Sequence, residues 1–153
     1  MERELFTKLE RWMNKKNRKP LIIQGARQVG KTWIMKEFGA RFYENPVYIN
    51  FDNNKAMKDV FELDFDLKRI LSAIKIEYGK SFQAENTLII FDEIQEAPKA
   101  LASLKYFYEN APEYAIVAAG SLLGVAMHKK TSFPVGKVDF MDLYPLNFQE
   151  FLC

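Results

Sequence analysis

One short stretch of this chain constrains its fold more than any other. An apolar run over residues 21–23 leads into a segment with the spacing G-x-x-x-x-G-K-S/T. The segment consists of Gly25, Ala26, Arg27, Gln28, Val29, Gly30, Lys31 and Thr32. Glycines at both ends allow backbone angles that other residues avoid, so successive amide groups can turn inward around an anion. The pattern predicts a strand, a phosphate-binding loop and a helix that begins at Lys31 and adds the positive end of its dipole.

Two side chains of this loop have chemistry of their own. Lys31 can reach the β- and γ-phosphates of a nucleotide as a point charge, and the Thr32 hydroxyl can bind a magnesium ion. The alternative is a glycine-bearing turn from strand to helix that binds no ligand. Because a strand pattern precedes the loop and a helical pattern follows it, we assign the whole segment to binding the phosphates of a nucleotide.

Length and composition fit a single globular domain. The chain has 153 residues, 48% hydrophobic and 27% charged, and a domain of this length buries about 70% of its unfolded surface. The net charge of +2 gives no argument for a nucleic-acid partner. A basic cluster contains Lys15, Lys16, Arg18 and Lys19. We interpret it as a helix cap and a solvated turn in preference to a DNA contact.

The sequence favours a soluble, cytoplasmic protein. Cys153 is the only cysteine, so no intramolecular disulfide can form, which is typical of a reducing compartment. The charged N-terminus does not resemble a secretory signal. No apolar run approaches the roughly 18 residues needed to span a bilayer, so we expect no membrane association.

Strand and helix patterns alternate along the chain. Helices are expected over residues 3–16, 32–42, 54–61, 66–78 and 98–109. Strands are expected over residues 21–24, 47–51, 88–91, 114–119 and 137–143. The second helix is expected to bury Trp33, Ile34, Met35 and Phe38. The strands are continuous apolar runs, which is typical of burial on both faces of a parallel sheet. The fold class is therefore α/β, a three-layer sandwich.

The third expected strand ends in two acids, Asp92 and Glu93. Four apolar residues followed by an acid form the Walker B pattern, in which Asp92 would hold the magnesium ion. Glu93 could act as a base or orient a water molecule. P-loop kinases of small molecules commonly lack the second acid, so the pair favours water as the nucleophile and hence hydrolysis. The alternative is a strand that ends in two solvated acids.

Ser121 follows the fourth expected strand directly, at the sheet edge where ligands of open α/β sheets bind. Its hydroxyl could contact the attacking water or the γ-phosphate. Alternatively, Ser121 caps a helix over residues 122–127.

Longer motifs extend the pattern over almost the whole chain. They are Gly-x-Arg-Gln-x-Gly-Lys-Thr, Phe-Asp-Glu-Ile-Gln, Ala-Gly-Ser-Leu-Leu-Gly, Ser-Phe-Pro-Val-Gly-Lys and Leu-Tyr-Pro-Leu-Asn-Phe-Gln-Glu-Phe. Together they resemble a family of AAA+-like P-loop ATPases of bacteria and archaea. The Arg-Gln pair in the loop and Gln95 after the acids are more specific than the general Walker patterns. The resemblance implies a parallel five-stranded sheet of AAA+ type, with strand order 5-1-4-3-2.

The resemblance also implies roles for single residues. It assigns the segment from Gly25 to Thr32 to the phosphates and magnesium, Asp92 to the metal, Glu93 to the water and Ser121 to a sensor position. In this family the ATPase core precedes a C-terminal domain of unknown function, proposed to be nuclease-like in some relatives. The implied partners are ATP, the chain's own C-terminal domains or a second copy of the chain, and DNA.

Two departures from the family pattern bear on activity. Relatives often have arginine where this chain has Lys137, and lysine lacks the forked geometry that suits a transferring phosphate. The chain ends at Cys153, where the family continues into a lid and further domains, and it has no arginine after Arg69. An arginine finger can contribute about 10³ to 10⁵ in rate. We therefore expect residues 1–153 to be an ATPase core without lid or C-terminal domain, which binds Mg-ATP and hydrolyses it slowly. A nucleotide-gated switch with little turnover and a P-loop kinase remain as alternatives.

Overall fold

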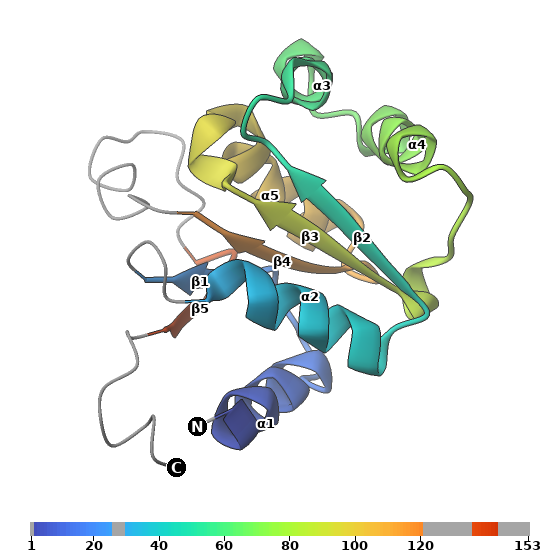
Figure 1. Cartoon of the computed structure of the whole chain (residues 1–153). Helices are drawn as coiled ribbons and strands as arrows, with labels where there is room; N and C mark the ends of the chain where they lie inside the picture. The colour runs from blue at the N-terminus through green and yellow to red at the C-terminus, as the bar shows by residue number, and fades with distance from the viewer. Residues whose placement is uncertain (1, 26–29, 121–135, 144–153) are drawn as a thin grey trace.

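A parallel sheet forms the middle layer of the molecule (Figure 1). The computed structural model describes residues 2–25, 30–120 and 136–143. Within them the strands are β1 (Leu21–Gln24), β2 (Asn45–Asn50), β3 (Thr87–Asp92), β4 (Ala115–Ala119) and β5 (Asp139–Asp142). Their order is β2-β3-β4-β1-β5, and every neighbouring pair is parallel. The predicted order is confirmed, with β4 between β1 and β3.

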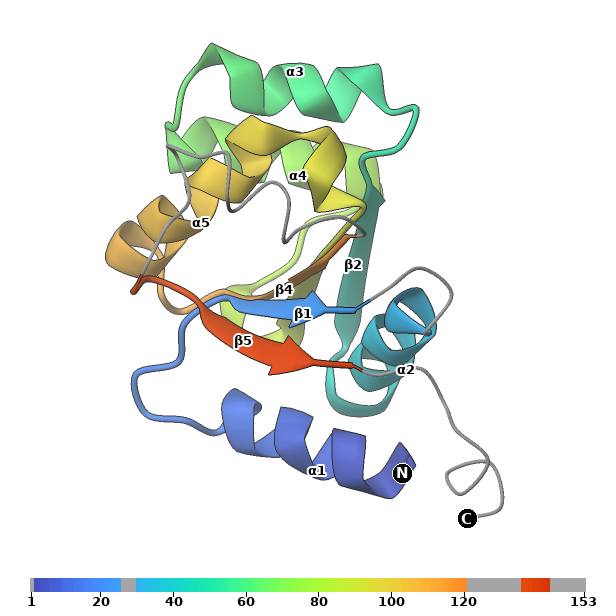
Figure 2. The same ribbon diagram turned by 90° about the vertical axis from the view of Figure 1, so that its left-hand side faces the viewer.

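Helices cover both faces of this sheet, as Figures 1 and 2 show. One face carries α1 (Glu2–Met13) and α2 (Lys31–Phe42). The other face carries α3 (Lys55–Leu63), α4 (Leu67–Tyr78) and α5 (Pro98–Asn110). Two short 3-10 turns, η1 (Ala84–Asn86) and η2 (Ile94–Glu96), flank β3. The three-layer α/β sandwich is therefore confirmed. In the described ranges, no helix is both long and apolar enough to cross a membrane.

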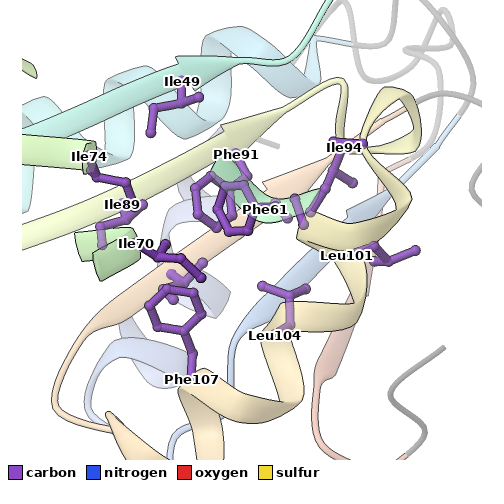
Figure 3. Close-up of a cluster of buried hydrophobic side chains, with 14 of the residues drawn as sticks. Ile49, Phe61, Ile70, Ile74, Ile89, Phe91, Ile94, Leu101, Leu104 and Phe107 are labelled. Carbon is purple, nitrogen blue, oxygen red and sulfur yellow. The ribbon is translucent and has the colours of Figure 1, made fainter. Parts of the chain in front are cut away.

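Strand alternation divides the apolar core into two halves. On the side of α3, α4 and α5, Ile89 and Phe91 of β3 meet Phe61 of α3 and Phe107 of α5 (Figure 3). The rings of Phe61 and Phe91 pack edge to face, with centroids 5.7 Å apart. A fully buried Phe side chain contributes about 1.5 to 3 kcal/mol through removal from water. This half of the core therefore fixes the carboxyl end of β3, where the two acids lie.

The other half of the core lies under α1 and α2. Leu9 and Trp12 of α1 and Ile34 and Phe38 of α2 are buried there. The expectation that Trp33 is also buried is wrong, because its side chain is 51% exposed. Successive residues of a helix lie about 100° apart, so Trp33 falls beside the buried stripe formed by positions 34, 35 and 38.

Several expected boundaries shift for local reasons. The first helix ends at Met13 instead of residue 16, and the side chain of Arg18 donates to the carbonyl of Met13 (3.4 Å). Arg18 also donates to the carbonyls of Pro112 (3.1 Å) and Glu113 (3.2 Å). The helix-cap interpretation is thus confirmed for Arg18. Strand β2 includes Pro46, which the sheet tolerates because β2 is an edge strand.

Polar caps define the starts of α3 and α4. The Asn54 side chain accepts a hydrogen bond from the amide of Met57, and the Asp66 side chain accepts from the amides of Lys68 and Arg69. Both residues were expected inside their helices and instead precede them as caps, which satisfies amides that no turn of the helix can pair.

Candidate functional site

The candidate site lies at the carboxyl edge of the sheet. Gly25 follows β1, Asp92 ends β3 and Gly120 follows β4. Because β1, β4 and β3 are neighbouring parallel strands, these three positions are brought to one edge. Helix α2 begins at the same edge (Figure 2). Ligands of open α/β sheets bind at such an edge.

Some of the predicted site residues are not described. Ala26, Arg27, Gln28 and Val29 lie outside the described residues, and so does Ser121. Their roles remain predictions. The structure places the other predicted residues, which are Gly25, Gly30, Lys31, Thr32, Asp92 and Glu93.

Gly30 enters α2 in a conformation that favours glycine. Its backbone has φ 87° and ψ 19°, in the left-handed region, and it occupies the N-cap position of α2. Glycine has no side chain to cap the first amides of the helix. The first backbone amides of α2 therefore receive no cap from Gly30, and they lie at the positive end of the helix dipole, which attracts anions.

Lys31 connects the two ends of the predicted phosphate loop. Its ammonium Nζ donates to the carbonyl of Gly25 at 2.6 Å, and the residue is only 9% exposed. Burial lowers the pKa of Lys31 below its ordinary value, while the nearby charges of Glu93 and Asp92 act in the opposite direction. The structure thus brings the predicted phosphate-binding lysine within electrostatic range of both predicted acids.

Asp92 is held by three hydrogen bonds. Its Oδ2 accepts from the hydroxyls of Thr32 (2.5 Å) and Tyr48 (2.6 Å), and its Oδ1 accepts from the amide of Glu93 (2.9 Å). The residue is 2% exposed. Hydrogen bonds to a charged acceptor are stronger than those between neutral groups. The carboxylate is therefore fixed in orientation toward the start of α2.

Tyr48 is a site residue that the sequence analysis missed. Its pKa lies well above the ordinary value, because burial, the hydrogen bond to Asp92 and the charge of Asp92 all disfavour the phenolate. The hydroxyl therefore stays protonated and donates a hydrogen bond to Asp92. Lys36 of α2 lies over the Tyr48 ring, with Nζ 4.1 Å from the centroid. One sequence signal could have revealed Tyr48. Side chains two positions apart on a strand lie on the same face, so Tyr48 shares a face with Asn50, and Asn50 is the register partner of Asp92.

Glu93 leaves the strand in an unusual backbone conformation. Its φ of 53° and ψ of 44° are left-handed, which is uncommon for a residue with a side chain. Its carboxylate Oε1 accepts a hydrogen bond from Nε2 of Gln95 at 2.7 Å. Gln95 is one of the residues that carry the family resemblance, but the sequence alone predicts no role for it.

The donor set at Asp92 fits a magnesium ion. Thr32 Oγ1 and Asp92 Oδ2 are hard oxygen donors, and the hydrogen bond of 2.5 Å between them brings them together. Magnesium prefers such ligands and is commonly bound by one or two carboxylates together with substrate phosphates. The same two side chains were predicted to hold it.

Lys137 lies away from this edge. It precedes β5 at the opposite, amino end of the sheet, and its Nζ pairs with Glu109 at 3.2 Å. The structure therefore does not bring Lys137 to the phosphate-binding edge of its own chain, and the effect of a lysine at this position on activity stays a prediction.

Comparison of the sequence with protein families assigns the chain to one family. A family model described as AAA domain matches residues 17–152. No curated protein matches the chain.

Solved structures share the fold at low sequence identity. The Walker-type ATPase PABY2304 of Pyrococcus abyssi aligns with a TM-score of 0.64 and 18% identity, over 98% of this chain and 55% of that one. The ORC1 protein of Aeropyrum pernix, solved in complex with DNA, aligns with a TM-score of 0.56 and 15% identity, over 96% and 44%. PCH-2 of C. elegans aligns with a TM-score of 0.52 and 14% identity, over 95% and 40%. The chain spans about half of the length of these proteins or less.

Proposed function

This chain belongs to the AAA domain family, and from that premise we propose that it binds Mg-ATP at the carboxyl edge of the sheet and hydrolyses it slowly. The observation that carries the proposal is the contact between Thr32 and Asp92. These residues are 60 positions apart in the chain, and their oxygens lie 2.5 Å apart beside the buried Lys31. A hydroxyl, a carboxylate and a lysine at a helix N-terminus form the set that Mg-ATP requires.

Binding would use the backbone and two side chains. The segment from Gly25 to Thr32 would surround the phosphates with amide groups, and Lys31 would exchange the carbonyl of Gly25 for phosphate oxygens. Thr32 and Asp92 would hold the magnesium ion, which supplies charge neutralisation between the β- and γ-phosphates. Tyr48 would keep the Asp92 carboxylate turned toward Thr32.

Hydrolysis would require Glu93 to accept a proton. The oxygen of a water molecule attacks the γ-phosphorus, the bond from that phosphorus to the bridging oxygen breaks, and ADP leaves with the electron pair. Glu93 takes the proton that the water loses. We propose that Ser121 contacts the γ-phosphate or the water from the neighbouring strand end. DNA, further domains of the same protein or a second copy would be partners by family analogy alone.

Calorimetry with Mg-ATP tests the site. Lys31→Ala should weaken binding by about 100-fold or more, since it removes a charge-assisted contact to the phosphates. Lys68→Ala, which removes an exposed lysine of α4, serves as the control and should bind like the parent. Equal binding by parent and Lys31→Ala would show that the site is wrongly assigned.

Product analysis separates the alternatives. Glu93→Gln should bind Mg-ATP like the parent and release no phosphate. Phosphate that appears on an acceptor instead of in solution would indicate a kinase. A switch would be indicated by two results together. The parent would bind nucleotide tightly but take many minutes for each round of hydrolysis, and it would bind a partner in only one nucleotide state.

A further inference from the structure

The side chain of Gln95 connects two strand ends of the candidate site. Its Nε2 donates to Glu93 Oε1 at 2.7 Å. A carboxylate only accepts hydrogen bonds, so the amide must turn its nitrogen toward Glu93 and its oxygen away. That oxygen, Oε1, is buried and has no hydrogen-bond partner in the described part of the chain.

The oxygen of Gln95 lies against Gly120, just after β4. A Cβ atom at position 120 would overlap Gln95 Oε1 and would lie 3.2 Å from the amide nitrogen of Ile94. Real Cβ atoms essentially never approach another atom closer than 3.0 Å. Gly120 is not among the glycines with positive φ, so backbone freedom does not explain it. A side chain at position 120 would therefore have to displace the Gln95 amide, which fills that space.

The turn that carries Gln95 is itself firmly anchored. Ile94 is fully buried in the core under α3 and α5 (Figure 3). Backbone hydrogen bonds close the turn, from the amide of Glu96 to the carbonyl of Glu93 (3.0 Å) and from Ala97 to Ile94 (2.9 Å). A side chain that positions another needs such a rigid support.

From these contacts we propose that Gln95 is a positioning residue, which holds the Glu93 carboxylate in one orientation and is itself held against Gly120. Gln95 contacts Oε1 of Glu93, and the other carboxylate oxygen, Oε2, would then take the proton of a water molecule. The orientation of Glu93 is thereby linked to the end of β4, one residue before Ser121. The inference rests on the proposed role of Glu93 in hydrolysis.

The contact can be measured without nucleotide. In NMR spectra of the isotope-labelled chain, the side-chain amide of Gln95 should exchange slowly with water and should shift when Glu93 is replaced by alanine. The exposed Gln83 is the internal control and should do neither. If the Gln95 amide exchanges as fast as that of Gln83, the proposal is overturned.

The role is tested by single-turnover hydrolysis. Gln95→Met removes the amide at similar size, and it should lower the rate by about tenfold or more, a part of what a general base contributes, while Mg-ATP affinity stays within about twofold. In a Glu93→Gln background it should have no further effect, because the two residues act as a unit. Gln95→Asn keeps an amide on a shorter side chain, so its hydrolysis rate should lie between those of the parent and Gln95→Met. A parent rate in Gln95→Met, with Glu93→Gln inactive, would overturn the inference.

Gly120→Ala separates positioning from mere packing. It should lower both the melting temperature and the rate, because the new methyl group displaces the Gln95 amide. Adding Gln95→Ala should recover most of the melting temperature and none of the rate. Recovery of both would show that Gln95 only fills space and would overturn the inference. If Glu93→Gln hydrolyses ATP like the parent, or the parent does not bind Mg-ATP, the proposed function fails, while the amide measurement still decides whether Gln95 holds Glu93.

Discussion

At the scale of single residues, Tyr48 determines how Asp92 faces the predicted magnesium site. Its hydroxyl donates to the same carboxylate oxygen as Thr32. Groups that orient a metal ligand typically contribute about 10- to 100-fold in metal affinity. We expect Tyr48→Phe to raise the magnesium concentration needed for half-maximal ATP binding by about tenfold. Tyr106→Phe, at a tyrosine stacked on Phe65, is the control. An unchanged magnesium midpoint in Tyr48→Phe would contradict this role.

Tyr43 provides a pH-dependent test of the core. Burial raises its pKa to about 12, and its hydroxyl is buried without a hydrogen-bond partner in the described part of the chain. The folded protein therefore keeps this proton above pH 10, where the unfolded chain loses it. The contribution to stability is complete below pH 10 and falls as the pH rises from about 10 to 12, by at most about 1.4 kcal/mol per pH unit.

Urea unfolding measures that contribution. Tyr43→Phe removes an unpaired hydroxyl at equal shape, so it should be neutral or slightly stabilising at pH 7. Relative to the parent, the variant should gain stability as the pH rises above 10. If the two proteins lose stability in parallel up to pH 11, the Tyr43 hydroxyl is not shielded from water.

At the scale of elements, α3 covers the core through few residues. Phe61 is 1% exposed and contacts Phe51 and Phe91, whereas Leu63 of the same helix is 70% exposed. Phe61→Ala should lower the free energy of unfolding by about 3 to 5 kcal/mol. Leu63→Ala should change it by no more than about 0.5 kcal/mol. Urea unfolding of both variants checks the difference, and a cost near that of Leu63→Ala would contradict the packing of α3.

The elements also show what the sequence could and could not predict. Continuous apolar runs such as residues 88–91 predict buried parallel strands because every position faces a helix layer. The starts of α3 and α4 were placed one residue early, since a cap such as Asp66 has the composition of the helix that it precedes. Trp33 was wrongly predicted to be buried, because its hydrophobicity does not show whether it lies within the buried stripe of α2 or beside it.

The same limit applies within the site. Lys31, Thr32 and Asp92 could be predicted because their spacing follows from phosphate and metal chemistry. Tyr48 and Gln95 could not, because each acts only through a neighbour that the fold supplies. Tyr48 reaches Asp92 through the pairing of β2 with β3, and Gln95 reaches Glu93 through a 3-10 turn.

At the scale of the whole molecule, the candidate site ties together segments that are distant in the chain. The order β3-β4-β1 brings the predicted phosphate loop, Asp92 and Gly120 to one edge, although β1 and β4 are separated by most of the chain. A ligand that contacts α2 and β3 at once binds the folded state and has no such site in the unfolded chain. Its binding energy therefore stabilises the whole fold.

This coupling gives a prediction for thermal unfolding with and without the ligand. At an ATP concentration of about 100 times the Kd, binding should stabilise the domain by about 2.7 kcal/mol. For a domain of this size that corresponds to a rise in Tm of roughly 5 to 10 °C. Removal of magnesium with EDTA should abolish most of the rise, because the proposed contribution of Thr32 and Asp92 to nucleotide binding requires that ion. Lys31→Ala should show almost no rise with Mg-ATP, whereas Lys68→Ala should follow the parent. If ATP raises the Tm of Lys31→Ala as much as that of the parent, the nucleotide binds elsewhere and does not join α2 to β3.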